Sequence, residues 1–251
     1  MPCEFKGWVM MYLSKYADSK NVIIHYYDTL EQSDEQLLPL VVCPGLSETA
    51  EEYIDVLQAM LPRRCIVLSF RGRGKSDTPE RGYNLDEHIS DIESVVHHAG
   101  LKSIHLFGYS RGVAYALGFA RKHKEQIKSL ILGDYPPEHR AMPREWATDY
   151  INHYLITFNR IDNIRPQAVR GIQRESLHIN LENRFEIPVL VARGMLQGSL
   201  ITDEDIARYK TMCGNLSIKE YGQSGHDIKD AEKGAFYRDI VHFLLCVAII
   251  N

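Results

Sequence analysis

Short apolar runs alternate along the chain with longer segments of helical periodicity. The runs are rich in β-branched residues and too short for helices, so they predict strands at 22–24, 40–42, 65–68, 103–107, 130–132 and 187–191. Between them, apolar side chains recur at intervals of three and four within 53–61, 89–96 and 113–120, which is typical of helices with one buried face. Strands that are apolar throughout, alternating with such helices, predict an α/β fold in which helices flank a mostly parallel central sheet.

The alternation is interrupted once, between 135 and 186. This segment contains no strand candidate, and its aromatic side chains recur at helix-like intervals: Trp146, Tyr150, Tyr154 and Phe158. We interpret 135–186 as a short helical cap, inserted after the strand that ends near Gly133 into a core domain formed by 1–134 and 187–251. The same aromatic side chains would also suit an ordinary helix pair packed on the core.

Composition and charge are those of an ordinary globular enzyme. The 251 residues are 45% hydrophobic and 25% charged, with a net charge of -4 and no long run of one sign. This balance does not indicate nucleic acid or an anionic membrane as a partner. The most apolar stretch, 240–250, is too short to cross a bilayer and is expected to form a buried helix face. We expect a monomer or homodimer whose partner is a small-molecule substrate.

The cysteines do not follow the spacing of a disulfide framework or a zinc site. Their number is odd and no two are spaced as C-x-x-C: Cys3, Cys43, Cys65, Cys213 and Cys246. Reduced, mostly buried thiols are typical of cytosolic proteins. Residues 1–6 include an early acid and lack the apolar core of a signal peptide. We therefore expect a cytoplasmic protein that uses no metal and no organic cofactor.

Ser110 lies where a predicted strand passes through a tight turn into a predicted helix. Gly108 and Gly112 flank it in the sequence GYSRG. A serine hydroxyl is a useful nucleophile only when it is exposed, close to a base and next to donors for the developing oxyanion. Glycines on both sides permit the strained turn that presents such a serine. The pattern predicts Ser110 as a nucleophile, with the backbone N–H of Arg111 in the oxyanion hole.

These residues resemble the α/β-hydrolase family, and the resemblance extends over nearly the whole chain. Upstream, the sequence CPGL at 43–46 ends a strand where the family usually has His-Gly, with Pro44 in place of the histidine. The resemblance implies that the N–H of Leu46 is the second oxyanion donor. The sequence SFRGRGKSD at 69–77 is similar to the family's D-x-R-G-x-G-x-S turn and lacks the spacing of a nucleotide-binding motif, so we interpret it as a structural turn.

His226 is the predicted base. It stands in the sequence GQSGHD, beyond the proposed cap and ahead of the final helix. The family order is nucleophile, acid, histidine, and the family presents its base in a glycine-flanked loop at this place. His226 would accept the proton of Ser110 and later return it to the leaving group.

The acid is missing from its usual place. Most relatives have an aspartate shortly after the strand predicted at 187–191, but here the loop 194–200 reads GMLQGSL and holds no carboxylate. Some family members place the acid after the preceding strand, where this chain has Asp134. We predict Asp134 as the acid that orients the histidine. Asp134 could instead cap the turn into the proline pair. Asp203 is the alternative acid, although it also suits a helix N-terminus.

A serine at this position argues against the dehalogenases and epoxide hydrolases of the family, whose nucleophile is an aspartate. We predict a carboxylesterase that cleaves a small or medium acyl ester through an acyl-Ser110 intermediate. Hydrolysis of a carbon–carbon, amide, lactone or thioester bond is the alternative within the fold. Because a fold is not a function, a weakly hydrolytic small-molecule receptor or signalling protein also stays open. The side chain of Arg111 would contact an anionic substrate or the protein's own carboxylates.

Overall fold

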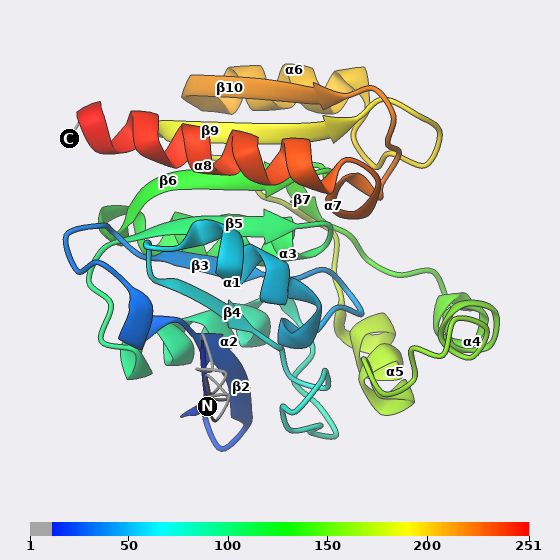
Figure 1. Cartoon of the computed structure of the whole chain (residues 1–251). Helices are drawn as coiled ribbons and strands as arrows, with labels where there is room; N and C mark the ends of the chain where they lie inside the picture. The colour runs from blue at the N-terminus through cyan, green and yellow to red at the C-terminus, as the bar shows by residue number, and fades with distance from the viewer. Residues whose placement is uncertain (1–11, 251) are drawn as a thin grey trace, which may run out of the picture.

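An eight-stranded sheet forms the centre of the molecule (Figure 1), in a computed structural model that describes residues 12–250. The strand order is β1-β2-β4-β3-β5-β6-β9-β10. The pairs β1/β2 and β2/β4 are antiparallel, and the other neighbours are parallel. The predicted α/β class with a mostly parallel sheet is therefore confirmed. The strands are β1 (Leu13–Asp18), β2 (Ile23–Asp28), β3 (Leu40–Cys43), β4 (Cys65–Leu68), β5 (Ile104–Tyr109), β6 (Ile127–Gly133), β9 (Phe185–Gly194) and β10 (Cys213–Tyr221).

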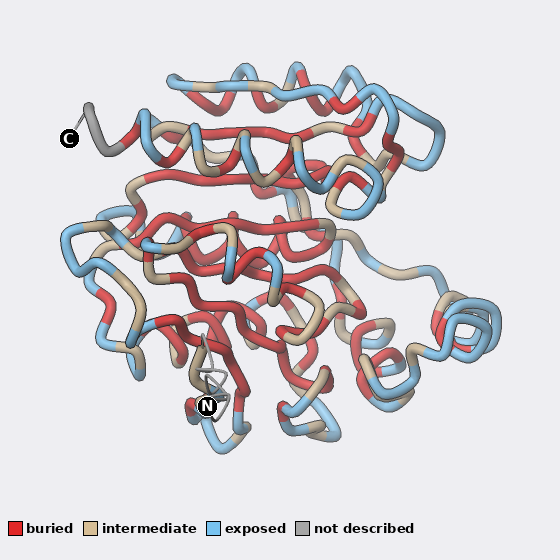
Figure 2. The backbone as a smooth tube through the Cα atoms, in the orientation of Figure 1, coloured by how far each residue is buried: buried red, intermediate tan, exposed pale blue. Residues whose placement is uncertain are grey.

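Helices cover both faces of the sheet and create two separate apolar layers. One layer packs the sheet against α1 (Ile54–Met60) and α8 (Lys233–Ile250), which lie in front of the strands in Figure 1. The other packs it against α2 (Leu85–His98), α3 (Gly112–Lys122) and α6 (Asp203–Met212). Every residue of β3, β4 and β5 is buried, as the red central strands of Figure 2 show, which explains why these strands are apolar throughout. Shorter helices complete the core: the 3₁₀ turns Leu30–Gln32, Ala50–Tyr53 and Lys124–Gln126, and α7 (Ile228–Ala231).

The apolar C-terminal stretch belongs to α8 and packs on the sheet. Its buried side chains recur at helical spacing: Phe236, Ile240, Leu244 and Val247. One face of the stretch is thus buried, whereas Leu245 and Cys246 on its other side are exposed. Among the helices in the described part of the chain, none has both the length and the apolar character needed to cross a membrane.

Two strands of the central sheet, β1 and β10, were not predicted from the sequence. Both lie at the edges of the sheet, and their side chains alternate between buried or half-buried and exposed positions instead of forming an apolar run. An edge strand is covered less completely than a central one, so burial does not demand apolar residues at each position. The structure also extends β9 to Phe185, two residues before the predicted start at 187.

The segment 135–186 lies beside the sheet, at the end where the parallel strands finish (Figure 1). It contains β7 (Glu138–His139), α4 (Trp146–Asp149), a π-helix (Tyr150–Leu155), α5 (Pro166–Glu175) and β8 (Ile179–Asn180). The two-residue strands β7 and β8, which were not predicted, pair with each other and join the two ends of the segment. Its helices share a small apolar cluster, while the outer face of α4 is exposed (Figure 2). The division into a core and a cap stays a prediction.

Three of the cysteines are buried free thiols, namely Cys43, Cys65 and Cys213, whereas Cys246 is exposed. Burial raises the pKa of the thiols of Cys43 and Cys65 far above the usual range, so both are inert at neutral pH. Cys3 and the N-terminal residues 1–6, on which part of the expected location depends, lie outside the described residues.

Candidate active site

Ser110 occupies the turn between β5 and α3. Its φ is +53°, in the left-handed region that non-glycine residues rarely adopt. Its N–H donates to the carbonyl of Gly133 at 2.8 Å, which ties the turn to the end of β6. Such strain, held by neighbouring structure, is typical of a nucleophile at a strand-to-helix turn.

A continuous hydrogen-bonded chain joins Ser110, His226 and Asp134. The Nε2 atom of His226 lies 2.8 Å from the Oγ of Ser110, and its Nδ1 lies 2.8 Å from an oxygen of Asp134. Asp134 is fully buried, and the side chain of His226 is one-third exposed. The structure thus brings together the three side chains that the sequence analysis selected, although His226 lies 92 residues from Asp134 and 116 residues from Ser110 along the chain.

Asp134 is held by the loop that lacks a carboxylate. Its carboxylate accepts the N–H of Gly194 at 3.1 Å, the hydroxyl of Ser199 at 2.6 Å and the N–H of Leu200 at 3.0 Å, besides the imidazole of His226. These donors balance the buried negative charge and fix the carboxylate against the histidine. The sequence showed only that this loop had lost an acid, and nothing in the spacing of Ser199 indicated that it would donate to Asp134.

Asp203 stands elsewhere. It is the first residue of α6, with Thr202 as the N-cap, and its carboxylate is 90% exposed and accepts a hydrogen bond from Arg193. The structure therefore brings Asp134 to the histidine and leaves Asp203 on the surface, next to a helix N-terminus.

The loop that carries His226 is fixed on both sides of the histidine. The Tyr109 hydroxyl donates to the carbonyl of His226, and the rings of the two residues stack at 5.6 Å. Ahead of the histidine, the carboxylate of Glu232 accepts hydrogen bonds from the N–H of Gln223 and the hydroxyl of Ser224. These contacts hold the loop at His226 itself and at the residues before it.

The two predicted oxyanion donors belong to backbone segments that border Ser110. Arg111 follows it directly, and Leu46 lies in the turn after β3, where a Cβ on Gly45 would come within 3.1 Å of the Cβ of Ser110. Within residues 12–250, neither the N–H of Leu46 nor that of Arg111 donates a hydrogen bond. Both are therefore free to bind an oxygen of a substrate.

The side chain of Arg111 does not enter the cavity. It is buried, and its guanidinium donates to the hydroxyls of Tyr115 and Ser176 and to the Nε2 of His139. Burial and the nearby guanidinium lower the pKa of His139 to about 4, so the imidazole is neutral and can accept. From the sequence, Arg111 was expected to contact an anionic substrate or a carboxylate of the protein. In the structure it contacts hydroxyls and a neutral imidazole instead.

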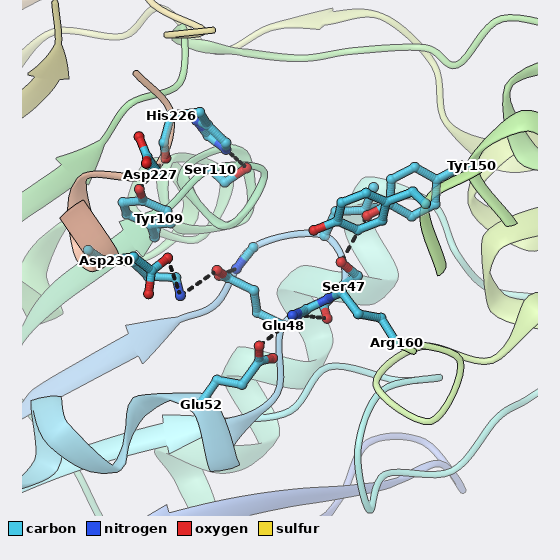
Figure 3. Close-up of a pocket in the computed structure, with 14 residues that line it drawn as sticks. Ser47, Glu48, Glu52, Tyr109, Ser110, Tyr150, Arg160, His226, Asp227 and Asp230 are labelled. Atoms are coloured by element: carbon cyan, nitrogen blue, oxygen red, sulfur yellow. Dashed lines mark hydrogen bonds and ion pairs between the residues drawn. The ribbon is translucent and has the colours of Figure 1, made fainter. Parts of the chain in front are cut away.

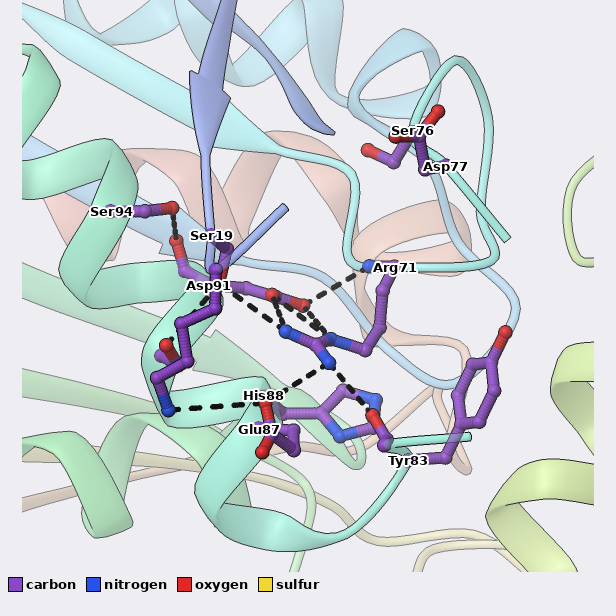
Figure 4. A network of polar contacts seen from close by, with 12 residues as sticks. Ser19, Arg71, Ser76, Asp77, Tyr83, Glu87, His88, Asp91 and Ser94 are labelled. Atoms are coloured by element: carbon purple, nitrogen blue, oxygen red, sulfur yellow. Dashed lines mark hydrogen bonds and ion pairs between the residues drawn. The ribbon is translucent and has the colours of Figure 1, made fainter. Parts of the chain in front are cut away.

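The arginine-rich turn is structural, as interpreted from the sequence. The guanidinium of Arg71 forms a buried ion pair with Asp91 at 2.6 Å (Figure 4), and Arg73 donates to the carbonyl of Leu46 at 3.0 Å. Arg73 also donates to His88, whose pKa is held well below the usual value by burial and by Arg73 itself. Both arginines bind groups of the protein itself, and Arg73 supports the turn after β3 that contains Leu46.

A cavity of about 400 Å³ opens beside Ser110 and His226 (Figure 3). The hydroxyl of Tyr150, from the π-helix, donates to the Oγ of Ser47 at 2.8 Å. Arg160 donates to the carbonyl of Ser47 and forms an ion pair with Glu52 at 2.7 Å. Most of the wall could not be read from the sequence, since it comes from segments that share no motif: Gly45, Leu46, Ser47, Glu48, Glu52, Tyr109, Ser110, Tyr150, Tyr154, Arg160, His226, Asp227, Lys229 and Asp230.

Comparison with known sequences agrees with this architecture. A family model described as alpha/beta hydrolase fold matches residues 39–221. The chain is 36% identical over 238 residues to N-formylmaleamate deformylase of Pseudomonas putida, an alignment that covers 82% of this chain and 88% of that protein. It is 28% identical over 134 residues to haloalkane dehalogenase 2 of Mycobacterium bovis, covering 51% of this chain and only 45% of the dehalogenase. The chain thus spans less than half the length of the dehalogenase it matches.

Solved structures show the same fold at low sequence identity. An esterase from Exiguobacterium antarcticum superposes with a TM-score of 0.77 at 18% identity, covering 92% of this chain and 99% of the esterase. At that identity the likeness concerns the arrangement of the elements alone.

Proposed function

This chain belongs to the α/β-hydrolase fold family, and on that premise we propose that it is a serine hydrolase that transfers an acyl group from its substrate to Ser110 and then to water. The observation that carries the proposal is the chain of two 2.8 Å hydrogen bonds from Ser110 through His226 to Asp134. A hydroxyl, an imidazole and a buried carboxylate in this order are the groups that activate a serine.

Each step follows from the positions of these groups. His226 takes the proton of Ser110 through Nε2 as the oxygen attacks the carbonyl carbon of the substrate. Asp134, at Nδ1, keeps the ring in the required tautomer and stabilises its positive charge. The N–H groups of Leu46 and Arg111 stabilise the oxyanion. The imidazolium then protonates the leaving group, and water releases the acyl group by the same route.

We propose a carboxylic ester as the bond that is cleaved, with a small or medium acyl group. The size of the cavity, about 400 Å³, supports a substrate of this range. Tyr150 and Tyr154 of the π-helix supply an aromatic wall, with ring centroids 4.9 Å apart. Ser110 in the nucleophile position argues against dehalogenation, despite the resemblance of half the chain to a dehalogenase.

Hydrolysis of a formyl or other amide is the second candidate. It is favoured by the 36% identity to N-formylmaleamate deformylase over most of both chains. A substrate that bears a carboxylate needs a cation in the cavity wall that is not already paired. Both cations in this wall have a glutamate partner: Arg160 pairs with Glu52 and Lys229 with Glu48. We therefore propose an uncharged substrate for either type of bond.

The test is a panel of substrates with the unsubstituted protein and with Ser110→Ala. p-Nitrophenyl acetate and butyrate represent esters, N-formyl and N-acetyl anilides represent amides, and a succinate half-ester adds a carboxylate. We expect turnover of the uncharged esters, weaker turnover of the half-ester, and a loss of about 10⁴-fold or more in Ser110→Ala. A fluorophosphonate probe should label the unsubstituted protein only.

The outcome also separates an enzyme from a receptor. Faster cleavage of the anilides than of the esters would replace the esterase by an amidase. If no member of the panel is turned over and the probe leaves Ser110 unlabelled, the hydrolase proposal is wrong, and the receptor or signalling role becomes the better explanation.

A further inference from the structure

The turn that carries the Leu46 N–H is held by a carboxylate. Oε2 of Glu48 accepts the N–H of Gly45 at 2.6 Å and the hydroxyl of Tyr53 at 2.5 Å. The N–H of Glu48 in turn donates to the carbonyl of Gly45 at 3.3 Å. Because the turn is only a few residues long, fixing Gly45 also fixes the direction of the next peptide, whose N–H is the proposed oxyanion donor.

This arrangement places a negative charge beside the reacting atoms. A Cβ on Gly45 would lie 2.7 Å from Oε2 of Glu48 and 3.1 Å from the Cβ of Ser110, so the carboxylate and the nucleophile are near neighbours. The side chain of Glu48 is only 14% exposed, and water screens it weakly. An unneutralised carboxylate here would oppose the negative charge that develops on the substrate oxygen during acyl transfer.

Lys229 supplies the balancing charge. Its Nζ lies 3.2 Å from Oε1 of Glu48, the oxygen that does not bind Gly45, and its side chain is 13% exposed. Burial disfavours the ammonium, but Glu48 and Asp230 raise the pKa of Lys229, so it is charged at neutral pH. Lys229 belongs to α7, three residues after His226. The ion pair therefore connects the oxyanion turn to the segment that carries the base.

We propose that Glu48 and Lys229 act together as positioning residues for the oxyanion hole: Glu48 orients the turn that carries the Leu46 N–H, and Lys229 cancels the charge of Glu48 so that it does not oppose the oxyanion. The inference rests on the proposed acyl transfer at Ser110. In the alternative explanation the ion pair only stabilises the fold. The kcat of the double variant would then be no higher than that of Lys229→Met.

The test is a double-mutant cycle on p-nitrophenyl acetate. Lys229→Met leaves the carboxylate of Glu48 without a balancing charge. We expect this variant to lower kcat about 10- to 100-fold with little change in KM, a loss no larger than that from removing one oxyanion donor. Glu48→Gln keeps an oxygen for the N–H of Gly45 and should cost about fivefold or less. The double variant should be faster than Lys229→Met, because the uncompensated charge is gone.

A transition-state mimic supplies the second measurement. A boronic acid forms a negatively charged tetrahedral adduct with an active serine, so its inhibition constant should rise in Lys229→Met by the same factor as kcat falls, and should recover in the double variant. Lys229→Arg, which keeps the cation, should stay close to the unsubstituted protein. Lys229→Gln repeats the comparison should Lys229→Met fail to fold by circular dichroism.

Lys233→Met is the matched control. Lys233 lies four residues further along, and its ion pair with Asp55 is exposed on both sides and outside the cavity. Its removal should leave kcat unchanged. A double variant no faster than Lys229→Met, or a Lys229→Met variant with normal kcat, overturns the inference while the proposed function stands. Absence of Ser110-dependent turnover in the unsubstituted protein overturns both.

Discussion

At the scale of single residues, the most informative position is Asp134. It sits at the end of β6 with a φ of +45°, and its carboxylate faces the histidine because three donors of the loop 194–200 surround it. The loop 194–200, which contains no carboxylate, thus provides hydrogen bonds to the predicted acid at the end of the neighbouring strand. Ser199, whose hydroxyl lies 2.6 Å from Asp134, makes the shortest of these contacts.

Replacing each aspartate in turn should show whether Asp134 or Asp203 is the acid that orients His226. Asp134→Asn keeps the shape of the side chain but removes the charge that orients His226, and we expect kcat to fall about 10⁴-fold. Asp203→Asn removes only an exposed ion pair with Arg193 and should stay within about twofold of the unsubstituted protein. Steady-state kinetics on the best ester checks both. A larger loss in Asp203→Asn than in Asp134→Asn would show that the acid has been misassigned.

At the scale of elements, the site depends on how closely the segments after neighbouring strands approach one another. The loop after β9 packs directly on the loop after β10, which carries the histidine. A Cβ on Gly194 would come within 1.8 Å of the carbonyl oxygen of Gly225, the residue before His226. No side chain fits there, so the end of β9 lies directly against the loop that carries His226.

Gly194→Ala should therefore displace the histidine loop. We expect a loss of about 100-fold in kcat, which is the cost of misplacing a catalytic group by about 1 Å, together with a lower melting temperature. Gly222→Ala is the control in the same loop, because a Cβ there would meet nothing within 4 Å. Kinetics and thermal melts of the two variants make the comparison. Equal activity of both would mean that the contact at Gly194 does not position His226.

The segment 135–186 also contacts the turn after β3 that contains Leu46. Tyr150 and Arg160 both bind Ser47, the residue after Leu46, through its hydroxyl and its carbonyl respectively. The segment that borders the substrate cavity is thereby attached to the backbone that would stabilise the oxyanion.

At the scale of the whole molecule, the core contains neutral histidines. Burial lowers the pKa of His25, His105 and His139 to about 4, and burial together with Arg73 holds the pKa of His88 well below its usual value. All four are buried and lie in different parts of the fold. In the unfolded chain the same side chains have their ordinary pKa of about 6.5.

The sign of the resulting pH dependence follows from proton uptake. Between about pH 6.5 and pH 4 the unfolded chain binds protons that the folded core does not, so the free energy of unfolding falls as the pH falls, by at most about 1.4 kcal/mol per pH unit for each histidine. Above pH 6.5 this contribution is fully present and flat. Thermal melts from pH 8 to pH 4 should show the decline below pH 6.5.

The contribution of a single histidine to the pH dependence of stability can be tested with one substitution. In His105→Gln, where an amide replaces the imidazole that bonds Ser129, the melting temperature should depend less steeply on pH than in the unsubstituted protein. His153→Gln, at an exposed position of the π-helix, should follow the unsubstituted curve. A His105→Gln curve with an unchanged slope would remove His105 from this explanation.

The amino-acid sequence by itself determined the elements whose signal is local. The central strands are apolar at every position because both of their faces are covered, and the helices repeat every three or four residues because one face is buried, so both can be recognised without knowing their neighbours. The glycine-flanked turn at Ser110 and the glycine-flanked loop at His226 are local patterns as well. Asp134 was predicted from the resemblance to family members that place the acid after this strand.

Only the tertiary structure decided what depends on contacts between remote segments. The edge strands β1 and β10 obtain their partners from the sheet and carry no strong pattern of their own. Ser199 is a partner of Asp134, and Glu48 a partner of Lys229, because parallel strands end at the same edge and bring their following loops together. The sequence therefore predicts the candidate groups for the reaction, whereas the wall of the cavity and the ion pair of Glu48 with Lys229 arise from packing.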